Sequence, residues 1–150
     1  MLVATDAAMS AWGPERVGVH LSPRGDLHQM GDSNRSNTFG HLAERLGNRG
    51  IAFLCVRERV AEDSIVPLLK HRFNGPLISN EGFTKDSAQE TISQGWADAI
   101  AFGNDYIANP DLVERLRNNA PLNTVRADTT YTHGAEGYSD YPALQFAAPV

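Results

Sequence analysis

Short apolar runs and amphipathic segments alternate along this chain of 150 residues. Four runs rich in apolar and β-branched residues occupy positions 16–23, 50–56, 75–79 and 97–102. Segments with helical periodicity follow them; in the first, Phe39, Leu42, Ala43 and Leu46 fall at i, i+3, i+4 and i+7. The pattern predicts four βα cycles, spaced by about 25 to 35 residues as βα units are.

The predicted strands are continuously apolar rather than alternating, which is typical of parallel strands covered on both faces. Helices are expected at 37–50, 63–73, 84–95 and 110–118. Their predicted N-caps are Asp63 or Ser64, then Thr84, and then Asn109 with Pro110 at the first helical position. The sequence therefore predicts an α/β fold with parallel strands.

No break in composition marks an internal boundary, so residues 1–150 are expected to form a single domain. The segment 121–150 contains the aromatic stretch "TTYTHGAEGYSDYPALQF", which has neither helical nor strand periodicity. We expect this tail to be irregular and to pack back onto the body of the domain.

Composition and charge limit the classes of function. A formal net charge of −5 and a pI of about 5.4 argue against nucleic-acid binding, which requires clustered Lys and Arg. No apolar run approaches the roughly 20 residues of a membrane span, and the N-terminus lacks the features of a secretion signal. The single cysteine, Cys55, fits a cytoplasmic location and is predicted to be a buried structural thiol. Trp12 and Trp96 are assigned to packing.

Parallel βα folds bind ligands at the carboxyl ends of their strands. This rule points to four loops, at 22–37, 57–63, 79–83 and 103–106. The last two are short turns of small residues that lead into helices, where main-chain N–H groups can converge on an anion. The residues leave two interpretations open, a phosphate site or ordinary tight βα turns.

Six stretches carry a family resemblance, in the order "RVGVHLSPRGD", "GDSN", "RGIAFLC", "GPLISNEGFT", "ADAIAFGNDYIANPDLVERLRNNAPLN" and "GAEGYSDYPAL". Together they resemble the C-terminal half of the old yellow enzyme family, over nearly the entire chain. The similarity is greatest to its bacterial alkene, N-ethylmaleimide and nitrate-ester reductase branch. The resemblance implies about four βα units forming the C-terminal half of a (β/α)₈ TIM barrel, and an FMN-dependent ene-reductase that uses NAD(P)H. Residues 1–150 would then be one partial domain.

The resemblance also implies where FMN would bind. It assigns the flavin phosphate to the main chain of two turns, Asn80, Glu81 and Gly82 after the third strand and Gly103 and Asn104 after the fourth. No metal ligands are implied.

Three of the matched positions differ from the family pattern. Many relatives carry an arginine at Asn104, where it pairs with the phosphate, and another at His20, beside the flavin ring. A histidine donates a hydrogen bond but carries only part of a positive charge at neutral pH. Glu81 is expected to point outward, because a carboxylate near the phosphate would repel it. The resemblance places His28 and Tyr131 near the substrate pocket.

The family's proton-donating tyrosine and paired substrate ligands belong to an N-terminal half that this sequence does not match. Whether the chain alone is an enzyme is therefore left open, and weak or absent turnover of an activated alkene is expected. The chain looks truncated, and a half-barrel would leave sheet edges to cover by a homodimer or a complementary N-terminal half. The alternative function is a non-catalytic half-barrel that binds a phosphate-bearing ligand or assembles with a partner.

Overall fold

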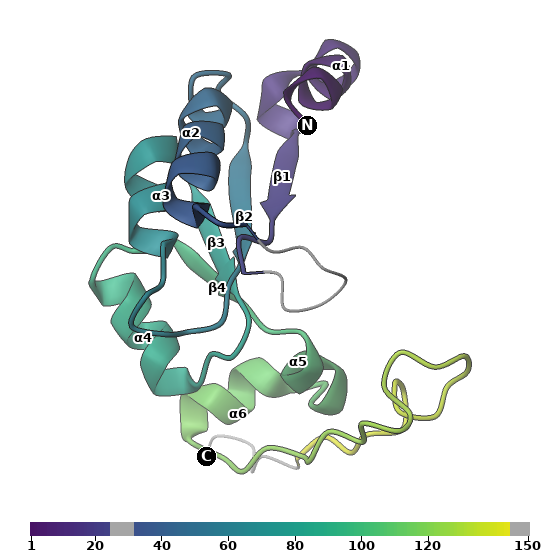
Figure 1. Ribbon diagram of the computed structural model, residues 1–150. Helices are drawn as coiled ribbons and strands as arrows, with labels where there is room; N and C mark the ends of the chain where they lie inside the picture. Colours follow the sequence, from purple (N-terminus) through teal and green to yellow (C-terminus); the bar gives the residue numbers. More distant parts are fainter. Residues whose placement is uncertain (25–31, 145–150) are drawn as a thin grey trace, which may run out of the picture. The chain divides into compact units, whose positions relative to one another are not determined.

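The computed structural model describes residues 1–24 and 32–144 (Figure 1). Contacts divide the chain into two compact units, 1–101 and 102–150, which are described separately below. The first unit holds α1 (Leu2–Trp12), a 3₁₀ turn at Pro14–Arg16, β1 (Gly18–Leu21), α2 (Arg35–Gly47), β2 (Phe53–Arg57), α3 (Val66–Phe73), β3 (Leu77–Asn80), α4 (Lys85–Ser93) and β4 (Ala99–Ala101). The second holds α5 (Asn104–Ala108) and α6 (Leu112–Asn118).

The four strands form one parallel sheet in the order β1-β2-β3-β4, which confirms the predicted βα cycles. β1 and β4 are its edges within the described residues. In register, His20 lies opposite Cys55, which lies opposite Ile78. Arg57 and Asn80, the last residues of β2 and β3, also lie opposite each other.

Only one face of this sheet is covered in the first unit. Leu21, Val56 and Ser79 point to that covered face, where each is 1% exposed or less and α2 and α3 pack side by side (Figure 1). The opposite face, called the open face below, carries exposed or half-buried residues: His20, Phe53, Cys55, Arg57, Ile78 and Asn80. The prediction of strands covered on both faces was therefore wrong for the described residues.

Local sequence explains two of the helix starts. Thr84 caps α4 as predicted, and it forms a reciprocal capping box with Ser87. Neither predicted cap of α3 is its N-cap, which is Ile65. The Asp63 carboxylate binds arginine side chains, and the Ser64 hydroxyl donates to Glu58 while it accepts from the Val66 N–H, the first N–H of the helix.

The second unit differs from its prediction in two places. α5 forms where a turn was expected, and α6 begins at Leu112 with Asp111 as its N-cap, two residues later than predicted. Asn109 is fully buried and does not cap α6, because its side chain accepts a hydrogen bond from the Asn123 N–H and donates one to the Asp105 carbonyl.

No helix or strand follows Asn118 among the described residues, so the segment from Asn119 to Leu144 is irregular. It is held within the second unit by Arg115, which is 2% exposed and donates to the Pro121 and Pro142 carbonyls over 2.6 and 2.9 Å. The expected packing of the tail on the rest of the chain stays a prediction.

Candidate functional site

The carboxyl ends of β2 and β3 present polar side chains on the open face of the first unit. Arg57 and Asn80 are adjacent there through the register of the two strands. Asn80 donates from its amide to the Ala101 carbonyl over 2.8 Å, which ties the end of β3 to the end of β4. Asn80 was predicted to bind the phosphate. Its side chain is bonded within the sheet, and its main chain continues from β3 into the turn.

The turn after β3 contains two successive residues with positive φ, Glu81 at 92° and Gly82 at 77°. Glycine adopts this conformation without strain, whereas a glutamate does so at a cost of about 1–3 kcal/mol. A Cβ built at Gly82 would meet only Arg59 Cγ, at 3.6 Å, so the backbone angle and not crowding requires glycine. Two consecutive residues with positive φ thus occupy the turn where the phosphate was predicted.

Glu81 is held in this strained position by an ion pair. Its carboxylate accepts a hydrogen bond from Arg57 Nη2 over 2.9 Å, and both side chains are about two-thirds buried. Glu81 was expected to point outward; instead it turns toward the arginine of the neighbouring strand. The pair places a guanidinium beside the predicted phosphate turn, and its charge is neutralised by Glu81.

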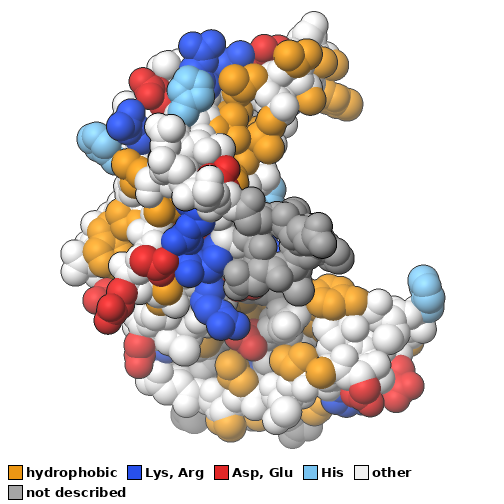
Figure 2. All heavy atoms as spheres, in the orientation of Figure 1, with side chains coloured by type: hydrophobic (Ala, Val, Ile, Leu, Met, Phe, Trp, Pro, Cys, Tyr) orange, Lys and Arg blue, Asp and Glu red, His pale blue; other side chains and the backbone are white. Residues whose placement is uncertain are grey.

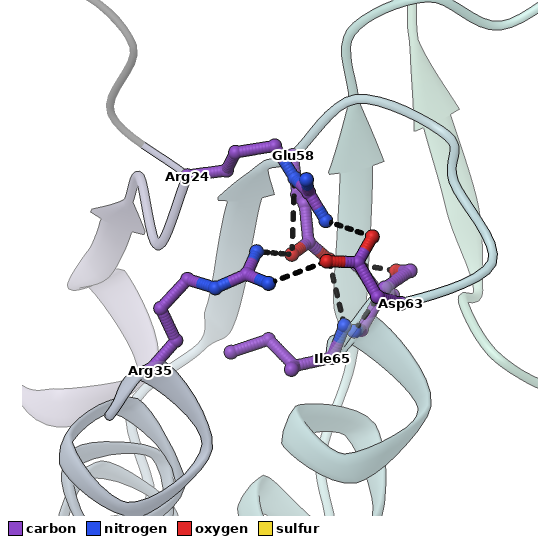
Figure 3. A network of polar contacts seen from close by, with 7 residues as sticks. Arg24, Arg35, Glu58, Asp63 and Ile65 are labelled. Carbon is purple, nitrogen blue, oxygen red and sulfur yellow. Dashed lines mark hydrogen bonds and ion pairs between the residues drawn. The ribbon is translucent and has the colours of Figure 1, made fainter. Parts of the chain in front are cut away.

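A second ionic cluster lies near the ends of β1 and β2 (Figure 3). Glu58 has a fully buried side chain, and its carboxylate accepts hydrogen bonds from Arg35 at 3.3 Å and from the Ile65 N–H at 2.9 Å. Arg24 and Arg35 also bind the Asp63 carboxylate, over 2.5 and 2.7 Å (Figure 3). The cluster joins the loops after β1 and β2 to the start of α2.

This cluster holds the pKa of the Asp63 carboxyl below its ordinary value, through hydrogen bonds first from Arg24 and then from Arg35. Sequence analysis missed the cluster, although the alternating charges of "RER" at 57–59 mark the loop. Both carboxylates accept hydrogen bonds from protein donors, so the cluster fixes the shape of the loop.

The other residues singled out in the first unit differ in exposure. His20 lies exposed on the open face of β1, where its side chain has access to a ligand bound on that face. His28 lies outside the described residues. Cys55 is half-buried rather than buried, and burial raises the pKa of its thiol, so the thiol stays protonated at neutral pH. Trp12 and Trp96 are 66% and 42% exposed, so packing accounts for only part of each.

In the second unit, the structure brings together three of the predicted residues. Tyr131 donates from its hydroxyl to Asn104 Oδ1 over 3.0 Å. Among the described residues, a Cβ built at Gly103 would meet only this same hydroxyl, at 3.8 Å, so these residues leave room beside Gly103. Tyr131 itself is 71% exposed and has a φ of 65°. A free space beside a glycine fits a turn that approaches a ligand closely.

Comparison with known proteins decides the family. The sequence profile of the NADH:flavin oxidoreductase / NADH oxidase family matches residues 2–123. The chain belongs to this family. It is 35% identical to 12-oxophytodienoate reductase 2 of Arabidopsis thaliana, over 98% of this chain and 42% of that protein. It is also 35% identical to a probable flavin mononucleotide-dependent alkene reductase of Leishmania infantum, over 93% of this chain and 39% of that protein.

Solved structures of the family agree. A morphinone reductase in complex with tetrahydroNAD superposes with a TM-score of 0.88 at 37% identity, over 96% of this chain and 40% of that one. The old yellow enzyme homologue from Zymomonas mobilis superposes with a TM-score of 0.88 at 36% identity, over 93% of this chain and 42% of that one. The parallel sheet and its helices thus match part of an old yellow enzyme TIM barrel, whose inner surface explains the open face. The chain spans about 40% of these relatives' length.

Members of the NADH:flavin oxidoreductase / NADH oxidase family use FMN with NAD(P)H as reductant. Among the described residues, no helix has the length and apolar character of a membrane span, and no group of three His, Cys, Asp or Glu side chains is arranged for a metal ion.

Proposed function

We propose that this chain forms the flavin-phosphate side of an FMN-dependent oxidoreductase that reduces activated C=C bonds with NAD(P)H. The observation that supports it most directly is the strained turn at Glu81 and Gly82, at the carboxyl end of a strand in a family that uses FMN. Such a turn directs successive main-chain N–H groups toward an anion. Bound FMN would supply hydride transfer from NAD(P)H to the alkene.

The residues of this chain have binding and orienting roles in this proposal. In the first unit, the main chain of Asn80, Glu81 and Gly82 holds the phosphate. In the second unit, the family resemblance assigns Gly103 and Asn104 to phosphate binding. His20 donates a hydrogen bond from the open face to the edge of the flavin ring. His28 and Tyr131 contribute to the substrate pocket.

The test compares FMN with riboflavin, which has the same ring but no phosphate. FMN is expected to bind more tightly to this chain, as measured by quenching of flavin fluorescence. Asn104→Arg adds a charge-assisted contact to the phosphate, worth about 1.5–3 kcal/mol, and is expected to tighten FMN binding by about tenfold to a hundredfold. Riboflavin binding should not change.

Asn118→Arg is the matched control, because it adds the same charge at an exposed position at the end of α6. Equal affinity for FMN and riboflavin, or equal gains in the two variants, would refute the phosphate site. Oxidation of NAD(P)H with an activated enone, measured on the 150-residue chain alone, is expected to be slow; fast turnover would show that the chain is catalytically complete.

The second candidate is a half-barrel that assembles with a copy of itself or with a complementary half. The open face and the edge strands favour it, together with the hydrophobic side chains exposed over α1, where Val3 is 82% and Trp12 66% exposed (Figure 2). Edges and apolar surfaces of this kind promote association. Light scattering on the purified chain tests it: a monomer at micromolar concentration would rule out self-assembly.

A further inference from the structure

A cavity of about 310 Å³ lies in the first unit, on the covered face of the sheet. Its walls come from the loop after β2, the start of α3, strand β3 and helix α4. The residues that carry the argument are Glu58, Val66, Ser79, Phe83, Thr91 and Trp96. Ser79 and Asn80 are consecutive in a strand, so the Ser79 side chain points to the covered face and the Asn80 side chain to the open face.

Ser79 presents an unpartnered hydroxyl in this cavity. The residue is 0% exposed, and its Oγ has no hydrogen-bond partner among the described residues. A buried hydroxyl without a partner destabilises a fold, whereas alanine would fill the same place without that penalty. A bound molecule with one oxygen at this point would satisfy the hydroxyl.

The rest of the lining sets the chemical class of that molecule. Val66, Pro67 and Phe83 make the walls mainly apolar, and Trp96 is 42% exposed beside them. Glu58 also borders the cavity, but its carboxylate is neutralised by Arg24 and Arg35. Glu62 lines the cavity as well, but it is exposed to water, which screens its charge. An anion therefore gains no ionic partner and a cation gains only a screened one, and the volume lies at the small end of ligand pockets, about 300 Å³.

We propose that this cavity binds a small uncharged ring, alicyclic or aromatic, that carries one hydroxyl or carbonyl oxygen and exchanges a hydrogen bond with Ser79 Oγ. The site is independent of flavin binding. Such a ring fills the apolar walls, and its oxygen satisfies Ser79 Oγ, a buried polar atom without a partner among the described residues.

The chain offers a direct reporter. It has two tryptophans, and Trp12→Phe leaves Trp96 as the single source of indole emission. In this background cyclohexanol, a saturated alcohol that FMN chemistry does not reduce, is expected to change Trp96 emission in a saturable way. Ser79→Ala should weaken its binding by about tenfold, the effect of one hydrogen bond. Ser93→Ala, on the exposed surface of α4, should leave binding unchanged.

Thermal unfolding of the unmodified chain gives a second measurement that needs no variant. Cyclohexanol is expected to raise the unfolding midpoint until the effect saturates, and sodium cyclohexanecarboxylate, with the same ring and a charge, is not. The proposal is overturned if Trp96 emission shows no saturable change, if Ser79→Ala binds cyclohexanol as well as the parent, or if the charged ring stabilises the chain equally.

Discussion

Arg57 and Glu81 form an ion pair 2.9 Å long between the end of β2 and the turn after β3. The pair places a carboxylate at the turn to which we assign the flavin phosphate, in a backbone conformation that favours glycine. It also neutralises the guanidinium of Arg57 beside this turn. Glu81 therefore adds both backbone strain and negative charge at this turn. Its removal should increase the affinity of the turn for a phosphate.

Glu81→Gly is expected to tighten FMN binding by about fivefold to tenfold, because it removes the repulsion and frees Arg57 for the phosphate. Glu81→Gln removes the same charge but keeps the strained φ, so it should give a similar gain in affinity. The glycine variant should then be more stable than the glutamine variant by about 1 kcal/mol, in urea denaturation. Unchanged FMN affinity in both variants would contradict the proposed phosphate position.

The buried carboxylate of Glu58 is expected to stabilise the first unit. Glu58→Ala leaves Arg24 and Arg35 without this acceptor and should lower the free energy of unfolding by about 3 kcal/mol. Asp63→Asn is the control: it touches the same arginines, but the Asp63 side chain is 62% exposed, so the loss should stay within about 1 kcal/mol. Equal losses of unfolding free energy in the two variants, measured by urea denaturation, would show that burial of Glu58 does not add to its contribution to stability.

Arg115 is expected to hold the tail in the second unit. Arg115→Met keeps the volume of the side chain but removes its bonds to the Pro121 and Pro142 carbonyls and to Asp111. Limited proteolysis should then cut within 121–144 at least about tenfold faster, which corresponds to a local loss of about 1.4 kcal/mol or more. Arg117→Met, at an exposed position on α6, should be cut at the parent rate. Resistance of both variants would show that other contacts hold the tail.

Asp98 should make stability depend on acid. Its pKa lies below the ordinary value of an aspartate, because Lys70 Nζ and then the Leu77 N–H donate to its carboxylate, each over 2.7 Å. A lowered pKa gives stability that is present above about pH 4, the unfolded value, and is lost as the pH falls through the folded value.

Asp98→Asn should therefore be less stable than the parent at pH 7, and the difference should shrink below about pH 4. Urea denaturation at several pH values measures this difference. Asp128→Asn, at an exposed position in the tail, serves as the control and should show no such trend. A difference that stays constant with pH would show that ionisation of Asp98 does not contribute.

The sequence by itself determined the four βα cycles, because apolar runs and helical periodicity are local patterns that each segment carries alone. It also determined the capping box at Thr84, whose two partners are three residues apart. Family motifs in the sequence identified the old yellow enzyme family, which the comparisons confirmed. The assignment of the cofactor-binding residues stays a prediction.

Only the tertiary structure decided which charged side chains meet. Arg57 lies 24 residues from Glu81, and Arg35 lies 23 from Glu58, so no local pattern pairs them. Asn109 was read as a helix cap from its neighbours, yet the distant Asn123 uses its side chain and α6 starts later. The open face follows the same rule: the strand sequences place apolar residues on both sides, but only the assembled sheet shows which side the helices cover.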